Sequence, residues 1–321
     1  MHSPSYKTQR TGSHHPKGAF RETVESLFFA IGVALVIRAG VVYPFKIPTG
    51  SMEGSLLVGD HILCNKFVYG IRTPDWIGIP YTKIGFFVPF TRTPGFRKPA
   101  RGDVVVFKYP RDLAEYYVKR CIAVSGDTVV IRDKVTYVNG RPFPNAPNTQ
   151  FIDSRVYPPG AQQRDIFPQG VGNAHNYGPI RVPAPGDTFR FTEANRPRWF
   201  EWFQLIVYEG GRIDLSYRGQ DIRLSEENID RWQTAIRMYP TESFKIHGQP
   251  LNDFVYTVKY RQYFMMGDNR DNSLDSRFWG FVPDRHVVGE ALMVYWSWND
   301  DVPFYRLPEK VRWRRLLNLI R

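Results

Sequence analysis

Cysteine is scarce in this chain: only Cys64 and Cys121 occur among its 321 residues. So few thiols exclude a disulfide scaffold and argue against a cysteine-rich metal site. The sequence also lacks Gly-x-Ser-x-Gly, a Walker A loop, His-Glu-x-x-His and Cys-x-x-Cys. These absences remove the usual marks of an α/β hydrolase, a nucleotide-binding enzyme and a zinc protease. We therefore expect no cofactor and no metal.

Acidic residues number 31 against 43 basic ones, which gives a net charge of +12. The excess lies at the two ends of the chain. Residues 1–24 carry +3 and residues 306–321 carry +5, whereas the 281 residues between them carry only +4. Charge confined to the ends is typical of a protein beside a membrane and not of a nucleic-acid-binding face. The expected partners therefore include a lipid bilayer and no nucleic acid.

A long uninterrupted apolar run is absent near the N-terminus, where Leu27–Ile37 has 11 residues. This run lies within Val24–Tyr43, which is 20 residues with two charges, Glu25 and Arg38. A helix of that length spans about 30 Å, enough to cross a bilayer. We predict a transmembrane helix over 24–43 that ends at Pro44, with its basic flank in the cytoplasm and the rest of the chain outside. A cleaved signal peptide and a buried helix are the alternatives.

Strand signals are dense beyond the predicted helix. Gly-Asp occurs five times, and four of these dipeptides precede apolar runs, at 61–63, 104–107, 128–131 and 188–191. Turn residues that lead into β-branched runs predict a mostly β, antiparallel fold. Further strands are expected at 116–124, 134–138, 260–266 and 287–298. One helix is expected after Ser225, with Ile229, Trp232 and Ile236 on one face.

The composition changes in the middle of the chain, where residues 141–180 are rich in proline, asparagine and glycine. We expect a β core from 44–140 and 261–305, with a second β-rich domain inserted at 141–260. The ends are a cytoplasmic basic tail, 1–23, and a basic amphipathic tail, 306–321. In the second tail, Trp313, Leu316, Leu317 and Ile320 would share one face of a short helix. That helix either lies on a membrane surface or is a frayed end.

Ser51 is the first candidate for chemistry. It follows Gly50, so its hydroxyl and its N–H can both be approached, and Thr49 offers a second hydroxyl. A nucleophile with two nearby donors fits an acyl-transfer site. The plainer interpretation is a turn that links the helix to the first strand.

Lys119 is the second candidate. On a strand it shares one face with Tyr117, Cys121 and Ala123, so its amine has apolar or small neighbours. The pKa of a free lysine is about 10.4, and loss of water lowers it. A neutral lysine can deprotonate a serine without histidine. The alternatives are a lysine that reaches water, or a histidine-based triad.

The third candidate is Gly267–Arg277, a polar segment directly after an apolar run. It lacks the glycine and closing glutamate of a calcium-binding loop. Asp275 and Arg277 would brace it, and the Ser273 hydroxyl would reach an amine such as that of Lys119. Without such a partner, the segment is a surface loop.

Together these segments resemble the type I signal peptidases (leader peptidases), membrane serine proteases with a Ser-Lys dyad. The resemblance covers roughly 24–140 and 260–298. The matching segments stand in family order: Ile47–Met52, Arg101–Phe107, Tyr117–Arg120 and Gly267–Pro283. The sequence departs from the family at Thr49, where many relatives have serine, and at Ala123 and Ser125, which replace glycine and proline.

The resemblance implies a role for each matching residue. Ser51 would be the nucleophile, Lys119 the general base, and Thr49 with the Ser51 N–H the oxyanion hole. Ser273 would orient Lys119, and Asp275 with Arg277 would be a structural pair. Small side chains at the −1 and −3 substrate positions would occupy shallow pockets lined by Phe45, Ile47, Met52, Leu56, Ile62, Val106, Tyr117 and Val118.

We therefore predict an endopeptidase that removes signal peptides from exported preproteins, through an acyl-enzyme. The resemblance implies a single-pass, monomeric protein of the bacterial inner membrane, with its catalytic domain on the periplasmic side. Two alternatives stay open: a Ser-Lys protease with one dedicated substrate, and a non-enzymatic, membrane-tethered β-domain that binds partners.

Overall fold

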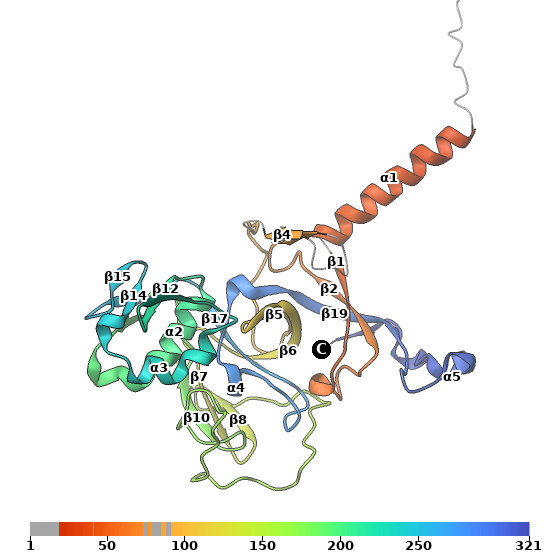
Figure 1. Cartoon of the computed structure of the whole chain (residues 1–321). Coiled ribbons are helices and arrows are strands. Elements are labelled where there is room, and N and C mark those ends of the chain that lie inside the picture. Colours follow the sequence, from red (N-terminus) through yellow and green to blue (C-terminus); the bar gives the residue numbers. More distant parts are fainter. Residues whose placement is uncertain (1–18, 41, 73–75, 79–84, 88–90, 321) are drawn as a thin grey trace, which may run out of the picture.

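The computed structural model describes residues 19–40, 42–72, 76–78, 85–87 and 91–320. Residues 1–18 of the expected basic tail lie outside this range. The first element, α1 (Ala19–Gly40), stands away from the folded body (Figure 1). Within the described ranges, no helix combines the length and apolar character needed to span a membrane.

The predicted end of this helix at Pro44 is wrong. The helix ends at Gly40, and β1 (Val42–Lys46) follows. Pro44 lies inside β1, opposite Leu63 of the neighbouring strand. Because β1 is the outermost strand of its sheet, it tolerates a residue that has no N–H to donate.

The core is an antiparallel sheet with the strand order β1-β2-β19-β5-β6-β17-β18, and β20 also pairs with β19. The strands predicted for the core are confirmed, and β19, formed by residues 287–297, lies between β2 and β5. The strands after β1 are β2 (Asp60–Asn65), β5 (Val104–Tyr109), β6 (Asp112–Val124), β17 (Gln262–Met266), β18 (Val282–Pro283), β19 (Val287–Ser297) and β20 (Asn318–Leu319).

Two smaller sheets adjoin the core. One has the order β10-β7-β8-β9 and joins strands on both sides of residue 140. The other is a hairpin of two short strands. Their strands are β7 (Thr128–Arg132), β8 (Val135–Val138), β9 (Arg141–Pro142), β10 (Tyr177–Arg181), β3 (Trp76–Gly78) and β4 (Gly85–Phe87). Cys64 and Cys121 are both buried, free thiols.

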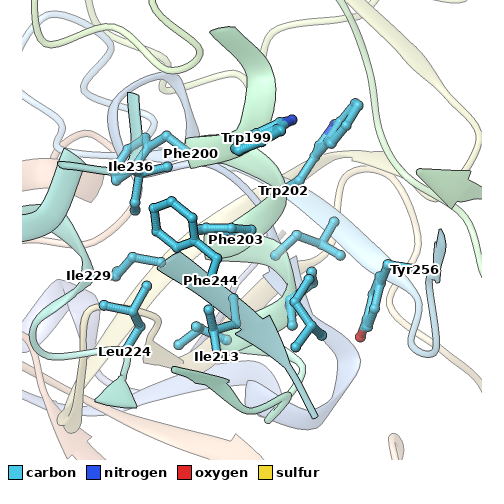
Figure 2. Close-up of a cluster of buried hydrophobic side chains, with 14 of the residues drawn as sticks. Trp199, Phe200, Trp202, Phe203, Ile213, Leu224, Ile229, Ile236, Phe244 and Tyr256 are labelled. Atoms are coloured by element: carbon cyan, nitrogen blue, oxygen red, sulfur yellow. The ribbon is translucent and has the colours of Figure 1, made fainter. Parts of the chain in front are cut away.

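A separate lobe spans residues 188–257 and has its own hydrophobic cluster (Figures 1 and 2). It contains α2 (Trp199–Tyr208), where we had expected strand character; nine of its ten side chains are buried. Eight of its ten residues are aromatic or aliphatic, and a short apolar run of this kind is as typical of a buried strand as of a buried helix. The remaining strands of the lobe are β11 (Thr188–Arg190), β12 (Ile213–Tyr217), β13 (Gln220–Leu224), β14 (Phe244–Ile246), β15 (Gln249–Pro250) and β16 (Val255–Thr257).

The helix predicted after Ser225 is divided in two, η3 (Ile229–Trp232) and α3 (Gln233–Met238). Ser225 is not its cap, because η3 begins after Asn228.

The other 3-10 turns are η1 (Gly50–Met52), η2 (Glu193–Arg198), η4 (Thr241–Ser243), η5 (Asp284–His286), η6 (Phe304–Arg306) and η7 (Trp313–Arg315).

The amphipathic helix predicted at the C-terminus is also wrong. After α4 (Ser276–Trp279) and α5 (Leu307–Lys310), the tail makes only the single turn η7. Leu317 then adopts a φ of 60°, and β20 follows. The backbone of the tail pairs with β19, so sheet pairing replaces the helix that the apolar spacing suggested.

The lobe cluster yields a stability prediction. Phe203 is fully buried in it, whereas Met238 of the same lobe is 76% exposed. Phe203→Ala should lower the free energy of unfolding by about 3–5 kcal/mol, because it removes a packed ring and leaves a cavity. Met238→Ala should change it by less than about 0.5 kcal/mol. Urea unfolding followed by tryptophan fluorescence measures both, and equal effects would contradict the packing described.

Candidate active site

Ser51 lies in a loop that joins β1 to β2, which we call the serine loop (residues 47–60). Backbone hydrogen bonds close its neck: Ile47 N–H donates to Asp60 O at 2.8 Å, and Gly59 N–H donates to Ile47 O at 3.0 Å. Ser51 sits at the centre of the short turn η1 within this loop. The closed neck holds the serine in a compact turn at the edge of the core sheet.

Lys119 approaches Ser51 from β6. It lies opposite Val105 of β5 and is only 3% exposed. Its Nζ is 2.5 Å from Ser51 Oγ, and it also donates to the Val118 carbonyl at 3.2 Å. The structure therefore brings together two residues that are 68 positions apart in the sequence.

The surroundings of Lys119 lower the pKa of its amine. Burial, which disfavours the ammonium form, lowers this pKa from 10.5 to about 8, although the Asp275 and Asp268 carboxylates oppose the shift. At pH 7 a pKa of about 8 leaves about one lysine in ten neutral, against about one in 2,500 for a free lysine. A buried, partly neutral amine beside a hydroxyl is suited to accept the proton of that hydroxyl.

The segment that follows β17 holds the serine loop in place. A Cβ at Gly267 would lie 2.3 Å from Ser51 O and 2.2 Å from Ser273 Oγ, so only glycine fits this approach. Asn269 donates from its backbone to Ser51 O at 3.2 Å and from its side chain to Gly50 O at 3.0 Å. We did not single out Asn269 from the sequence. An asparagine directly after Gly-Asp was the only signal.

A buried ion pair joins the same segment to β6, which carries Lys119 and which we call the lysine strand. Asp268 accepts two hydrogen bonds from the Arg120 guanidinium, at 2.8 and 2.6 Å, and both side chains are buried. Ser55 of the serine loop donates to the same carboxylate at 2.6 Å. Asp268 thus links the serine loop to the residue after Lys119. We had assigned Arg120 no role from the sequence.

Asp275 and Arg277 form a second buried pair, with two hydrogen bonds of 2.8 Å. Burial opposes the charge on Asp275, yet Arg277 and the Gly267 N–H hold the pKa of this carboxyl below its usual range. Arg277 also donates to Arg270 O at 2.6 Å and so closes the segment on itself. Ser273 lies beside the serine loop, but no hydrogen bond joins it to Lys119 in this structure.

Apolar side chains surround the two residues. Most of those predicted to line substrate pockets meet in one hydrophobic cluster. Its buried members include Ile47, Met52, Leu56, Ile62 and Val106, and Phe45 and Val118 pack against it. Tyr117 belongs to the neighbouring cluster, where it stacks on Tyr109 with ring centroids 4.4 Å apart. Within the described residues, no group of three or more His, Cys, Asp or Glu side chains is placed to hold a metal ion.

Known proteins resemble this chain, and their resemblance is independent of the geometry described above. A family model described as signal peptidase, peptidase S26, matches residues 20–194 and 204–296. The chain belongs to this signal peptidase family. This assignment confirms the predicted family and its reaction class, that of a peptidase.

Relatives match the chain over most of its length. Signal peptidase I of Pseudomonas aeruginosa is 31% identical over 287 residues, which are 86% of this chain and 72% of the relative. Signal peptidase I of Buchnera aphidicola subsp. Acyrthosiphon pisum is 32% identical over 279 residues, 85% of this chain and 74% of the relative. A solved signal peptidase I from Enterococcus faecalis matches with 21% identity and a TM-score of 0.24, covering 60% of this chain and 97% of its own.

The buried amine predicts a pH-dependent stability. The unfolded lysine keeps its proton up to about pH 10.5, whereas folded Lys119 releases it near pH 8. Between these values the unfolded state binds more protons, so wild-type stability rises with pH. Lys119→Met should therefore raise the free energy of unfolding at pH 6 by about 1–3 kcal/mol, and this gain should shrink above pH 8.

Thermal unfolding of the full chain in detergent between pH 6 and 10 measures this gain. Lys245→Met is the control, because Lys245 is exposed on β14. Its effect should not depend on pH in this range. A gain that stays constant from pH 6 to 10 would show that Lys119 is not desolvated.

Proposed function

We propose that Ser51 and Lys119 are the catalytic pair of a membrane-bound endopeptidase that removes N-terminal signal peptides from exported preproteins. The 2.5 Å contact between Lys119 Nζ and Ser51 Oγ carries this proposal. Neutral Lys119 takes the hydroxyl proton while Ser51 Oγ attacks the scissile carbonyl. The ammonium then gives a proton to the leaving amine, and the signal peptide remains as an acyl-enzyme. Lys119 next activates a water that hydrolyses this ester.

The oxyanion of each tetrahedral intermediate needs hydrogen-bond donors. We assign this role to the Ser51 N–H and the Thr49 hydroxyl. Thr49 is exposed, has an extended backbone (φ −131°, ψ 153°), and its side chain does not cap η1. Its hydroxyl is therefore available to a bound substrate.

Ser273, Asp275 and Arg277 support the pair in this proposal. Ser273 makes no hydrogen bond to Lys119 in this structure, but its hydroxyl lies close to Ser51 across Gly267, and we assign it the role of orienting Lys119. The Asp275–Arg277 pair fixes the segment that carries Ser273. The apolar cluster beside Ser51 receives the small side chains at the −1 and −3 positions of the signal peptide, since Met52 and Leu56 lie in the serine loop itself.

The same proposal places the protein in the bacterial inner membrane, with α1 as its anchor and the catalytic core, 44–140 and 261–305, outside. Leu27, Phe28 and Phe29 of α1 are 58–75% exposed, which suits contact with lipid. The inserted residues 141–260 contain the lobe with its own hydrophobic cluster. We favour a monomer.

Cleavage of a purified preprotein with an Ala-x-Ala site by the full chain in detergent tests the catalytic pair. Ser51→Ala and Lys119→Ala should each lower kcat/KM by at least about a thousandfold, because each removes one half of the proton transfer. Ser216→Ala and Lys245→Ala, which change exposed residues of the lobe, should match the wild type.

The outcomes separate the alternatives. Cleavage that survives Lys119→Ala would point to a histidine-based triad. No cleavage of this substrate by the wild type would favour a protease with one dedicated substrate or a binding module.

The exposed side of the C-terminal tail, together with the two residues before it, is the second proposed lipid contact. Phe304, Tyr305 and Trp313 are 61–85% exposed there, beside several basic residues. In vesicles with brominated acyl chains, Trp313 fluorescence should be quenched, as measured by the difference between wild type and Trp313→Phe. A difference spectrum as bright as in unbrominated vesicles would contradict lipid contact.

A further inference from the structure

The C-terminal tail also has a side that faces the serine loop, and Arg315 makes most of the contacts there. The Arg315 guanidinium reaches both oxygens of Asp60, with Nη2 at 2.5 Å and Nε at 3.0 Å, and donates to the Ser55 carbonyl at 3.0 Å. Asp60 is fully buried. A forked contact between arginine and a buried carboxylate is among the strongest and most directional hydrogen-bond pairs in proteins.

These contacts fall on the serine loop. Asp60 closes the neck of that loop and accepts a hydrogen bond from Leu57 N–H at 2.8 Å, while Ser55 lies four residues after the proposed nucleophile. Arg315 thus contacts the serine loop at two points, at Asp60 in its neck and at Ser55 in its middle. Arg312 adds a contact from the tail to the Val58 carbonyl at 2.7 Å.

The hydrogen bonds that begin at Arg315 continue to the lysine strand. Ser55, whose carbonyl accepts from Arg315, donates its hydroxyl to Asp268, and Asp268 pairs with Arg120. Arg120 follows Lys119 directly in β6. A chain of charge-assisted hydrogen bonds therefore runs from the tail through the serine loop to the strand that carries the proposed general base.

The end of the tail is fixed independently. β20 pairs with β19, and Ile320 N–H donates to the Leu292 carbonyl at 3.0 Å. The Ile320 side chain packs against the apolar cluster beside Ser51. The tail is therefore anchored on both sides of Arg315.

We propose that residues 312–320, which we call the C-terminal strap, position the proposed nucleophile, and that Arg315 is the positioning residue. The inference rests on the proposed function, because it assigns Ser51 the attack on substrate. Arg315 touches no reacting atom. It fixes the serine loop against the lysine strand, so that Ser51 Oγ stays within reach of Lys119.

Arg315→Gln tests this assignment, with Arg314→Gln as its matched control. Arg314 is an exposed arginine one residue away, and its side chain makes no hydrogen bond or ion pair in the described part of the chain. With the preprotein substrate in detergent, Arg315→Gln should lower kcat by about 10- to 100-fold and change KM by less than about threefold, because misplacing a nucleophile affects the reaction more than binding. Arg314→Gln should match the wild type in both constants.

Loss of Arg315 also leaves Asp60 as an unpaired buried charge, so reduced stability needs a separate control. The double variant Arg315→Gln/Asp60→Asn removes that charge. Its unfolding temperature should return toward the wild-type value while kcat stays low. Arg315→Lys keeps one charge but loses the fork, and an intermediate kcat is expected for it. These two variants also serve if Arg315→Gln alone does not fold.

Two results overturn the assignment: a wild-type kcat in Arg315→Gln, or recovery of both kcat and unfolding temperature in the double variant, which would make the contact purely structural. Ser51→Ala measured alongside separates the two proposals. If Ser51→Ala is inactive and Arg315→Gln is fully active, only the strap fails. If Ser51→Ala retains activity, the proposed function fails and the strap fails with it.

Discussion

The desolvation of Lys119 is the constraint on which the rest of this structure depends. An ammonium group loses much of its hydration in this position. The pKa of Lys119 therefore falls from 10.5 to about 8. The strand around Lys119 is paired on both sides, with β5 and with β17, and this pairing keeps the side chain away from water. A lysine with more room would reach water and regain its ordinary pKa.

Two carboxylates, Asp268 and Asp275, lie near Lys119 and act to raise its pKa. Each is held in a buried ion pair. Asp268 is neutralised by Arg120 and Asp275 by Arg277, each through a fork of two hydrogen bonds. An unpaired carboxylate at either position would stabilise the ammonium form of Lys119. The pairs therefore support the segment around Gly267 and limit its electrostatic effect on the amine.

The sequence predicted the strands of the core well, because alternation and Gly-Asp turns are local signals. It also predicted the juxtaposition of Ser51, Lys119 and the 267–277 segment, through a family resemblance and not through periodicity. It did not predict α2, whose short apolar run fits a buried strand as well as a helix, or the course of the tail. Trp313, Leu316, Leu317 and Ile320 have helical spacing. The part of β19 beyond its pairing with β5, however, offers the tail backbone hydrogen bonds that a short isolated helix cannot match.

Asn269 and Arg315 show why supporting residues are harder to find than reacting ones. A nucleophile and its base have few chemical identities, so a serine and a lysine in suitable segments attract notice. A residue that holds a loop acts through backbone carbonyls, as Asn269 does on Gly50 and Ser51 and Arg315 does on Ser55. Backbone carbonyls occur at every position, so no pattern in the sequence marks the partner. Only the path of the chain in space does, and for Arg315 that path brings residues 312–320 back to the loop of Ser51.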